Sequence, residues 1–439
     1  MPADSPNTPP PNARGPIAFA LGGIVGAGIF GIASLGQVDR NLDSDLAFYR
    51  EVRELVESEF VQERTDEQLL VSAIEGIVAD LDVYSRFYSG EELARIERAT
   101  SGTFLGLGAV FAPPTRDGRI LFPMPDSPAQ RSGLLVGERI LTIDGKSLSD
   151  MGDDEFAAAL GHLTEAPVTL VVASIGGEER LVTAVPESIA DPTVRHGLML
   201  DPTVGYLAIT SFSRRTLEEF DAEIVQLKQE GMARLIIDLR NNPGGVLRVA
   251  LGIANRFVAE GPLLFTDSRA GREEKMADSD EALYLGLPLV VLIDSDSASS
   301  SEVLAGTLQD HRAAVVVGTP SYGKGTVQTL TTLESPRSIL KVTTAFYTTP
   351  SGRQIDRQYS GNQDAAITPD LLVQLEPEDK RQLHARLSTY SPPRLYREEV
   401  QALLISTSGE PMDLLSNDRQ LSAALELIRG QGKPKSNDH

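Results

Sequence analysis

The chain contains no cysteine and no tryptophan among its 439 residues, and only five histidines. Without cysteine there can be no disulfide, no thiol nucleophile and no cysteine-ligated metal. The histidines form no His-Glu-x-x-His pattern, so the sequence implies no metal and no other cofactor. Basic residues are also few, 40 against 62 acidic ones, for a net charge of −22. Nucleic acid is therefore not an expected partner, because binding phosphates requires clustered Lys and Arg.

What is present fits a globular protein of two or three domains, with 41% hydrophobic and 23% charged residues. Residues 1–15, rich in Pro and Asn, are expected to form a disordered cytoplasmic tail. Residues 17–35 carry no charge and have about the length of a membrane-spanning helix, roughly 20 residues. We expect a signal anchor, a transmembrane helix over residues 16–36, with the catalytic part on the periplasmic or cell-envelope side. Cleavage after Ala33, followed by secretion, is the alternative.

Residues 40–100 have apolar residues at helical spacing and predict a helical region. In residues 101–187, short strand patterns alternate with glycine turns. The pattern from residue 188 to 375 is α/β, and Thr216 with Glu219 predicts a capping box at one of its helices. Residues 376–439 predict a C-terminal helical extension with a disordered tail.

A serine cluster at residues 297–301 follows a buried-strand pattern and precedes a helix. This order puts a serine at a helix N-terminus, where free backbone N–H groups can hold an anion. Lys324 lies between two glycines after an apolar strand, and a lysine in apolar surroundings can lose its proton near neutral pH. Such a pair can carry out acyl transfer without histidine. Taken alone, however, serine clusters are more often helix caps and Gly-Lys-Gly is more often a turn.

The order Ser297-Ala-Ser-Ser-Ser-Glu302, followed by Gly323-Lys-Gly-Thr-Val-Gln328, resembles the active-site signature of the carboxyl-terminal processing peptidases, or tail-specific proteases. The resemblance implies that Ser299 is the nucleophile, Lys324 the general base and Gln328 its support. Asp-Leu-Arg-Asn-Asn-Pro-Gly-Gly, ending at Gly245, resembles the second signature of that family. It implies an oxyanion hole formed by the backbone of Ser300 and of either Gly244 or Gly245.

Residues 101–187 resemble a PDZ domain as it occurs in bacterial proteases. The similarity rests on Ser127-Pro-Ala, Gly133-Leu, Gly137-Glu and Ile143-Asp-Gly. It implies a carboxylate-binding loop made of Phe104, Leu105, Gly106, Leu107 and Gly108. Two departures stand out. An arginine that the family often has near Gly161 is absent, so this chain must couple peptide binding to the protease differently or be less gated. Val83 also replaces the proline of a Leu-Asp-Pro-x-Ser turn.

The resemblance covers roughly residues 45–375. The expected fold is a mixed α+β and α/β multidomain chain. In it, a membrane helix and a helical segment precede a PDZ domain of β-sandwich type, which is inserted before an α/β serine protease core of the ClpP/crotonase kind. The expected activity is a serine endopeptidase that cleaves proteins near their C-termini, with the PDZ domain binding the free tail and gating activity. Protein substrates are the expected partners, with a homodimer as a further expectation. An inactive PDZ scaffold or chaperone is the alternative.

Overall fold

The computed structural model describes residues 42–112, 117–161, 163–334, 337–408 and 418–430. The predicted disordered tail and the predicted membrane helix at 16–36 lie outside these residues. Among the helices described, none combines the length and the apolar character needed to span a bilayer. The chain divides into two compact units, one ending at Ala73 and the other beginning at Ile74.

The first unit contains helix α1 (Leu42–Glu59) and the start of helix α2 (Asp66–Ala79). Helix α2 begins at Asp66 because Thr65 and Gln68 form a reciprocal pair of hydrogen bonds between side chain and backbone. No residue of α1 is buried, so its apolar stripe stays exposed. Helix α3 (Gly90–Ser101) follows in the second unit, after the short strand at Arg86–Tyr88.

The PDZ segment is built from short antiparallel strands. Strand β2 (Thr103–Gly106) pairs with β9 (Glu187–Ala190), and β3 (Ala109–Phe111) pairs with β4 (Ile120–Pro123). A four-stranded sheet has the order β6 (Lys146–Ser147), β5 (Arg139–Ile143), β7 (Val168–Ala173) and β8 (Glu179–Ala184). Helices α4 (Pro128–Arg131) and α5 (Asp153–Gly161) complete the segment. Its core contains Ile120, Leu134, Ile140, Leu170 and Val172, all at most 2% exposed.

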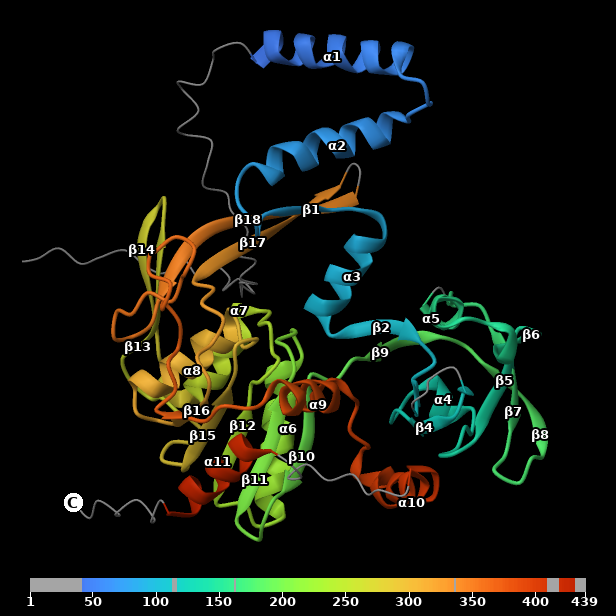
Figure 1. Ribbon diagram of the computed structural model, residues 1–439, viewed down its shortest axis with the longest axis vertical. Coiled ribbons are helices and arrows are strands. Elements are labelled where there is room, and N and C mark those ends of the chain that lie inside the picture. The colour runs from blue at the N-terminus through green and yellow to red at the C-terminus, as the bar shows by residue number, and fades with distance from the viewer. Residues whose placement is uncertain (1–41, 113–116, 162, 335–336, 409–417, 431–439) are drawn as a thin grey trace, which may run out of the picture. The chain divides into compact units, whose positions relative to one another are not determined.

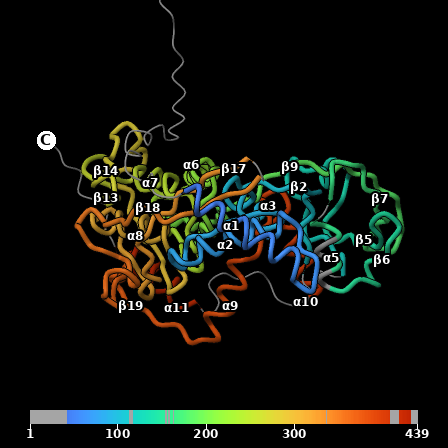
Figure 2. The backbone as a smooth tube through the Cα atoms, turned by 90° about the horizontal axis from the view of Figure 1, so that it is seen from above, coloured from blue at the N-terminus to red at the C-terminus, as the bar shows by residue number. Residues whose placement is uncertain are grey.

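The protease core is a six-stranded sheet with the order β10 (Val194–Met199), β11 (Val204–Ile209), β12 (Arg234–Asp238), β15 (Leu289–Ile293), β16 (Val315–Gly318) and β19 (Leu371–Leu372). All neighbours from β11 to β19 run parallel. The strands read as continuous apolar runs because both faces of the sheet are covered. In Figure 2, α11 (Arg419–Gly430) lies on the opposite side of the core from α6 (Thr216–Gln229) and α7 (Leu247–Asn255).

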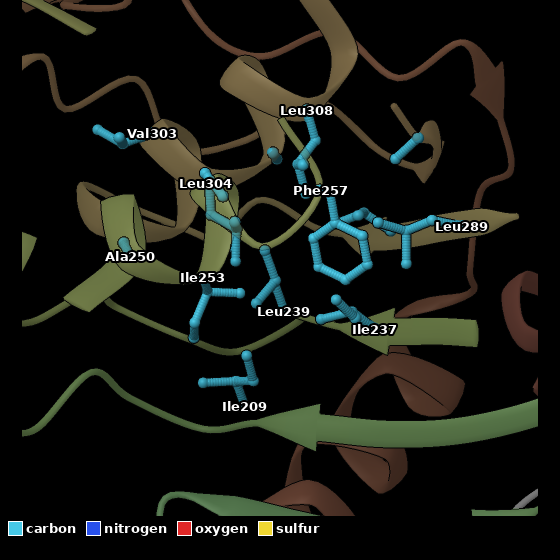
Figure 3. Packing of buried hydrophobic residues seen from close by; sticks show 14 of the residues in the cluster. Ile209, Ile237, Leu239, Ala250, Ile253, Phe257, Leu289, Val303, Leu304 and Leu308 are labelled. Atoms are coloured by element: carbon cyan, nitrogen blue, oxygen red, sulfur yellow. The ribbon is translucent and has the colours of Figure 1, made fainter. Parts of the chain in front are cut away.

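Helices α6, α7 and α8 (Ser300–Asp310) bury the larger apolar cluster against one face of this sheet. Figure 3 shows Leu304 and Leu308 of α8 beside Phe257, with Ile237 of β12 beneath them. On the other face, α9 (Pro377–Ser388) and α11 bury Leu383, Leu421 and Ile428. At about 25 cal/mol per Å² of apolar surface, burial of each such side chain contributes on the order of 2 kcal/mol.

A second sheet carries the segment that follows the lysine. Its order is β1 (Arg86–Tyr88), β18 (Arg337–Thr348), β13 (Pro262–Ser268) and β14 (Gly271–Met276), with β17 (Thr326–Glu334) paired to β18. The long β17–β18 hairpin is visible in Figure 1. Helix α10 (Arg397–Ser408) packs Val400 and Leu403 against Phe122 of the PDZ segment.

The predicted capping box at α6 is wrong. The helix begins at Thr216 itself, whose hydroxyl accepts the backbone N–H of Ser213. The carboxylate of Glu219 instead accepts the backbone N–H groups of Thr193 and Val194 and the hydroxyl of Thr193. The local pattern was misleading because a neighbouring strand competes for the same carboxylate.

Candidate active site

Two loops meet at the carboxyl edge of the six-stranded sheet. The glycine turn (residues 239–245) follows β12, and the serine loop (residues 294–299) follows the adjacent parallel strand β15. Because both loops leave the same edge of neighbouring strands, they lie in contact. The bonds from the serine loop and the start of α8 to the glycine turn are Ser297 Oγ to Leu239 O (2.8 Å), Ala298 N to Asn242 O (3.0 Å), Ser300 Oγ to Gly245 O (2.9 Å) and Ser301 Oγ to Asn242 O (2.9 Å).

Gly244 lies against the backbone of the serine loop. Its φ is +100°, and a Cβ placed there would lie 2.8 Å from both the Ala298 carbonyl oxygen and the Ser299 Cβ. Only glycine fits this conformation and this close approach. The N–H of Gly244 donates to Asn242 Oδ1 at 2.8 Å, whereas Gly245 is exposed.

Ser299 immediately precedes α8 and has φ +56° and ψ −115°. A non-glycine residue at positive φ costs on the order of 1–3 kcal/mol, and such strain clusters at functional sites. The side chain is half-buried, and the first N–H groups of α8 begin at the next residue. The serine at a helix N-terminus that the sequence predicted is therefore Ser299.

The buried carboxylate of Glu302 ties the serine to the lysine segment. It accepts the backbone N–H of Ser299 (2.7 Å), of Gly323 (2.6 Å) and of Lys324 (2.9 Å), and the hydroxyl of Ser321 (2.6 Å). Burial raises the pKa of Glu302, and these hydrogen bonds oppose that rise. The backbone donors are satisfied together only by an acceptor-only carboxylate.

Tyr347 of β18 makes a second link between the same two residues. Its hydroxyl donates to the carbonyl oxygens of Ser299 and Lys324, so one proton is shared between both chain segments. The side chain is 2% exposed. Glu302 and Tyr347 thus hold the backbones of Ser299 and Lys324 side by side.

Lys324 is half-buried, and this burial lowers the pKa of its ammonium from 10.5 to about 8. The Lys341 ammonium lowers the pKa further, while the carboxylates of Glu302 and Asp82 oppose it. In the described structure no hydrogen bond joins the Ser299 and Lys324 side chains. Catalytic hydrogen bonds often tighten only when substrate is bound.

The turn at residues 81–85 covers the lysine. Asp82 Oδ1 accepts the N–H groups of Tyr84 and Ser85, both at 2.7 Å, so an Asx turn forms although Val83 replaces proline. The turn places the ring of Tyr84 with its centroid 4.6 Å from Lys324 Nζ. An aromatic face at this distance attracts the protonated ammonium.

Gln328 lies on β17 rather than on a helix. Its amide nitrogen donates to Thr326 Oγ1 (2.9 Å) and Thr343 Oγ1 (3.3 Å). Within the described residues it makes no hydrogen bond to Lys324. His311, at the far end of α8, bonds to the Pro262 carbonyl rather than to Ser299.

The predicted carboxylate-binding loop is only partly a loop. Phe104, Leu105 and Gly106 lie in β2 and pair with β9, and Leu107 and Gly108 connect β2 to β3. Gly108 has φ +78°, and a Cβ there would lie 2.4 Å from the Ser127 Cβ. The Phe104 ring stacks under Arg98, with the guanidinium carbon 4.3 Å from the ring centroid. Leu105 is 38% exposed, Gly106 is buried within β2, and Leu107 joins the PDZ core.

Four side chains of this site were not predicted from the sequence: Asp82, Tyr84, Glu302 and Tyr347. Glu302 is adjacent to the serine cluster, but its position in the first helical turn had a simpler explanation in the helix dipole. Asp82 and Tyr84 lie inside the Leu-Asp-Val-Tyr-Ser motif. This motif predicts a turn, but it does not indicate that the turn lies against Lys324. For Tyr347 the sequence offered no signal that connects it to Ser299 or Lys324.

In the described part of the chain, one cluster has the composition to hold a metal. The ligand atoms of Asp294, Asp296 and His384 lie within 4.8 Å of one another. Lys380 Nζ already lies 2.6 Å from Asp296 Oδ2. A bound metal would have to compete with this ammonium.

The fold and the serine at a strained helix start define a serine peptidase core joined to a PDZ domain. The sequence pattern of peptidase family S41 matches residues 203–373, and that of the PDZ domain matches residues 120–174. A carboxy-terminal-processing protease from Bartonella bacilliformis is 31% identical over 402 residues, which cover 90% of each chain.

A carboxyl-terminal-processing protease from Synechocystis is 33% identical over 314 residues, 69% of this chain and 70% of that one. Among solved structures, the photosystem II D1 C-terminal processing protease shares 26% identity. It aligns with a TM-score of 0.41 over 79% of this chain and 92% of that chain. The chain belongs to the carboxy-terminal-processing proteases of peptidase family S41 and is a serine-type peptidase.

Proposed function

We propose that this chain cleaves protein substrates near their C-termini, with Ser299 as the nucleophile and Lys324 as the general base. The observation that carries the proposal is the lysine whose pKa falls to about 8, on a segment joined to Ser299 by Glu302 and Tyr347. A base with a pKa near the working pH is suited to proton transfer. Ser299 Oγ attacks the scissile carbonyl, and Lys324 takes its proton and returns it to the leaving amine.

The developing oxyanion is assigned to the backbone N–H of Ser300 and of Gly245. Gly245 is favoured over Gly244 because the N–H of Gly244 is already bonded to Asn242, whereas Gly245 is exposed. Each such donor contributes roughly 3–4 kcal/mol of transition-state stabilisation. Gln328 is proposed to support the lysine. To do so, its side-chain amide must give up its hydrogen bonds to Thr326 and Thr343 and turn toward Lys324.

Turnover of casein by the full chain tests the pair. We expect Ser299→Ala and Lys324→Ala each to lower kcat at least ~10³-fold, since each removes one half of the nucleophile and base unit. The surface variant Arg381→Ala serves as a control, because its side chain is 70% exposed and pairs with Glu378. Wild-type turnover in both active-site variants would refute the assignment. Loss of turnover in both would exclude the inactive scaffold, which is the alternative function.

The PDZ domain is proposed to bind the free C-terminal tail of the substrate through residues 104–108 and to gate cleavage. Support comes from the positive φ of Gly108, where the chain leaves β2, and from the exposed Leu105 at the end of that strand. Mass spectrometry of products from peptides with free or amidated C-termini tests tail binding. Equal cleavage of both forms would contradict it.

The N-terminal segment is proposed to anchor the protein, with the catalytic part outside the cytoplasm. The support is the uncharged stretch at residues 17–35. Fractionation of the full chain and of residues 37–439 tests this: the full chain should sediment with membranes and the shorter one should not. A mature N-terminus after Ala33 would favour secretion.

The exposed apolar stripe of α1 supports a homodimer, which light scattering would detect.

A further inference from the structure

Asp294 lies at the junction of the glycine turn and the serine loop. Its side chain is 4% exposed. One carboxylate oxygen, Oδ1, accepts the backbone N–H of Asn241 and that of Asp296, both at 3.0 Å. Asn241 has φ +58° and lies within the turn that leads to the two glycines. A single oxygen atom therefore holds the backbone of both loops.

The other oxygen of this carboxylate is held by a residue from a distant part of the sequence. His384 Nε2 lies 2.6 Å from Asp294 Oδ2 and donates to it, because a carboxylate oxygen only accepts. His384 is on α9, beyond the region matched by the protease family, which ends at residue 373. The bond lowers the pKa of Asp294 against the opposing effect of burial.

Helix α9 is fixed where it presents this histidine. Leu383 and Leu387, four residues apart on one helical face, are 3% and 1% exposed and pack under the six-stranded sheet. Ser388 Oγ also accepts the side-chain amide of Asn241 at 3.3 Å. The helix thus contacts the glycine turn directly as well as through Asp294.

The other charged groups around His384 are Asp296 and Lys380. Asp296 Oδ2 lies 3.8 Å from His384 Nε2, and Lys380 Nζ lies 2.6 Å from that same oxygen. Lys380 also donates to Ser295 at 2.6 Å. The Lys380 ammonium compensates Asp296. The imidazole is the charged or titratable side chain that bonds to Asp294, whose Oδ1 also accepts the hydroxyl of Ser297 at 3.3 Å.

We propose that His384 is a positioning residue for the reaction: it fixes the Asp294 carboxylate, which in turn holds Asn241 and Asp296 and so aligns the oxyanion donors with Ser299. The inference rests on the proposed function, since it needs Ser299 as nucleophile. The C-terminal helices are then part of the catalytic framework. A nucleophile displaced by about 1 Å can lose on the order of 10²-fold in rate, so a modest shift of either loop is costly.

The test uses the full chain, with casein turnover and the rate at which a fluorophosphonate labels Ser299. The fluorophosphonate reports on the nucleophile and the oxyanion donors without any contribution from tail binding. We expect His384→Ala to lower kcat and the labelling rate by a similar factor, about 10-fold to 100-fold, with KM little changed. His384→Gln, whose amide can donate to Asp294, should restore most of the rate, and added imidazole should raise the rate of His384→Ala.

Arg381→Ala on the same helix is the matched control and should behave as wild type in both assays. Wild-type rates in His384→Ala would overturn the proposal, as would an effect on KM alone. Equal loss in the Ala and Gln variants without imidazole rescue would show a purely structural role and also overturn it. A chelator that reproduces the loss in the wild type would assign the cluster to a metal instead. If Ser299→Ala keeps its turnover, it is the proposed function that fails.

Discussion

The two glycine-containing loops of this protein contrast sharply. The glycine turn at residues 239–245 is crossed by hydrogen bonds from the serine loop and from α8. In the PDZ segment 104–108, Phe104 to Gly106 pair with β9, and the chain leaves the strand at Leu107 and Gly108, where φ is +78° and an exposed Leu105 lies nearby in sequence. The first arrangement suits catalysis, where donors must be fixed before the reaction. The second suits a loop whose backbone groups are completed by a ligand.

Between these two loops, the larger effect is expected from crowding the rigid glycine turn. Gly244→Ala would push a Cβ to 2.8 Å from the Ser299 Cβ and the Ala298 carbonyl at φ +100°. We expect kcat to fall ~10²-fold to 10³-fold, as when an oxyanion donor is lost. Casein turnover measures this. Gly145→Ala, also at positive φ but with no atom within 4 Å of its Cβ, is the control for backbone strain alone. If kcat falls by a similar factor in both variants, the loss in Gly244→Ala does not come from the contact with Ser299.

A smaller effect is expected when the charge that joins serine to lysine is removed. Glu302→Gln keeps the shape but turns an NH₂ group toward two of the present donors. Each donor left unsatisfied costs ~1–3 kcal/mol, so the melting temperature should fall, and we expect kcat to drop about 10-fold to 100-fold. Calorimetry and casein turnover measure the two effects. An unchanged melting temperature and kcat would show that Glu302 does not hold the site.

The pH dependence of activity tests the environment of the lysine. As the proposed base, Lys324 must be neutral to accept a proton, and its pKa is lowered to about 8. If this assignment holds, kcat/KM should rise about tenfold per pH unit below 8 and level off above it. Removing the nearby ammonium in Lys341→Met should move this rise to higher pH. Removing the carboxylate in Glu302→Gln should move it to lower pH. A rise that stays at the same pH in both variants would contradict the assigned base.

The smallest effect is expected in the PDZ loop. Gly108→Ala would bring a Cβ to 2.4 Å from the Ser127 Cβ at φ +78° and so displace the loop. We expect KM for peptides with a free C-terminus to rise a few-fold, about 1 kcal/mol, while kcat is little changed. Gly177→Ala, at φ +87° with nothing within 4 Å, is the matched control. If kcat falls instead of KM rising, the PDZ segment contributes to the catalytic framework, and it does not differ from the glycine turn in this respect.

The sequence by itself identified the peptidase family, and the PDZ and protease segments, because their motifs are contiguous. Each of those motifs depends on local geometry: a glycine at positive φ, a serine before a helix, and a strand that enters a turn. Ser299, Lys324 and the pair Gly244 and Gly245 could therefore be predicted from their immediate neighbours alone.

Only the tertiary structure decided which residues hold these groups in place. Tyr84, Tyr347 and His384 come from a turn, a strand and a helix that are 23 to 240 residues from their partners in the sequence. From the sequence, Glu302 is explained by a favourable interaction with the helix dipole. Its hydrogen bonds to the backbone of Gly323 and Lys324 exist only in the folded chain. Hydrogen bonds between distant segments leave no periodic or contiguous pattern, since their geometry is set by the packing of helices on both faces of one sheet.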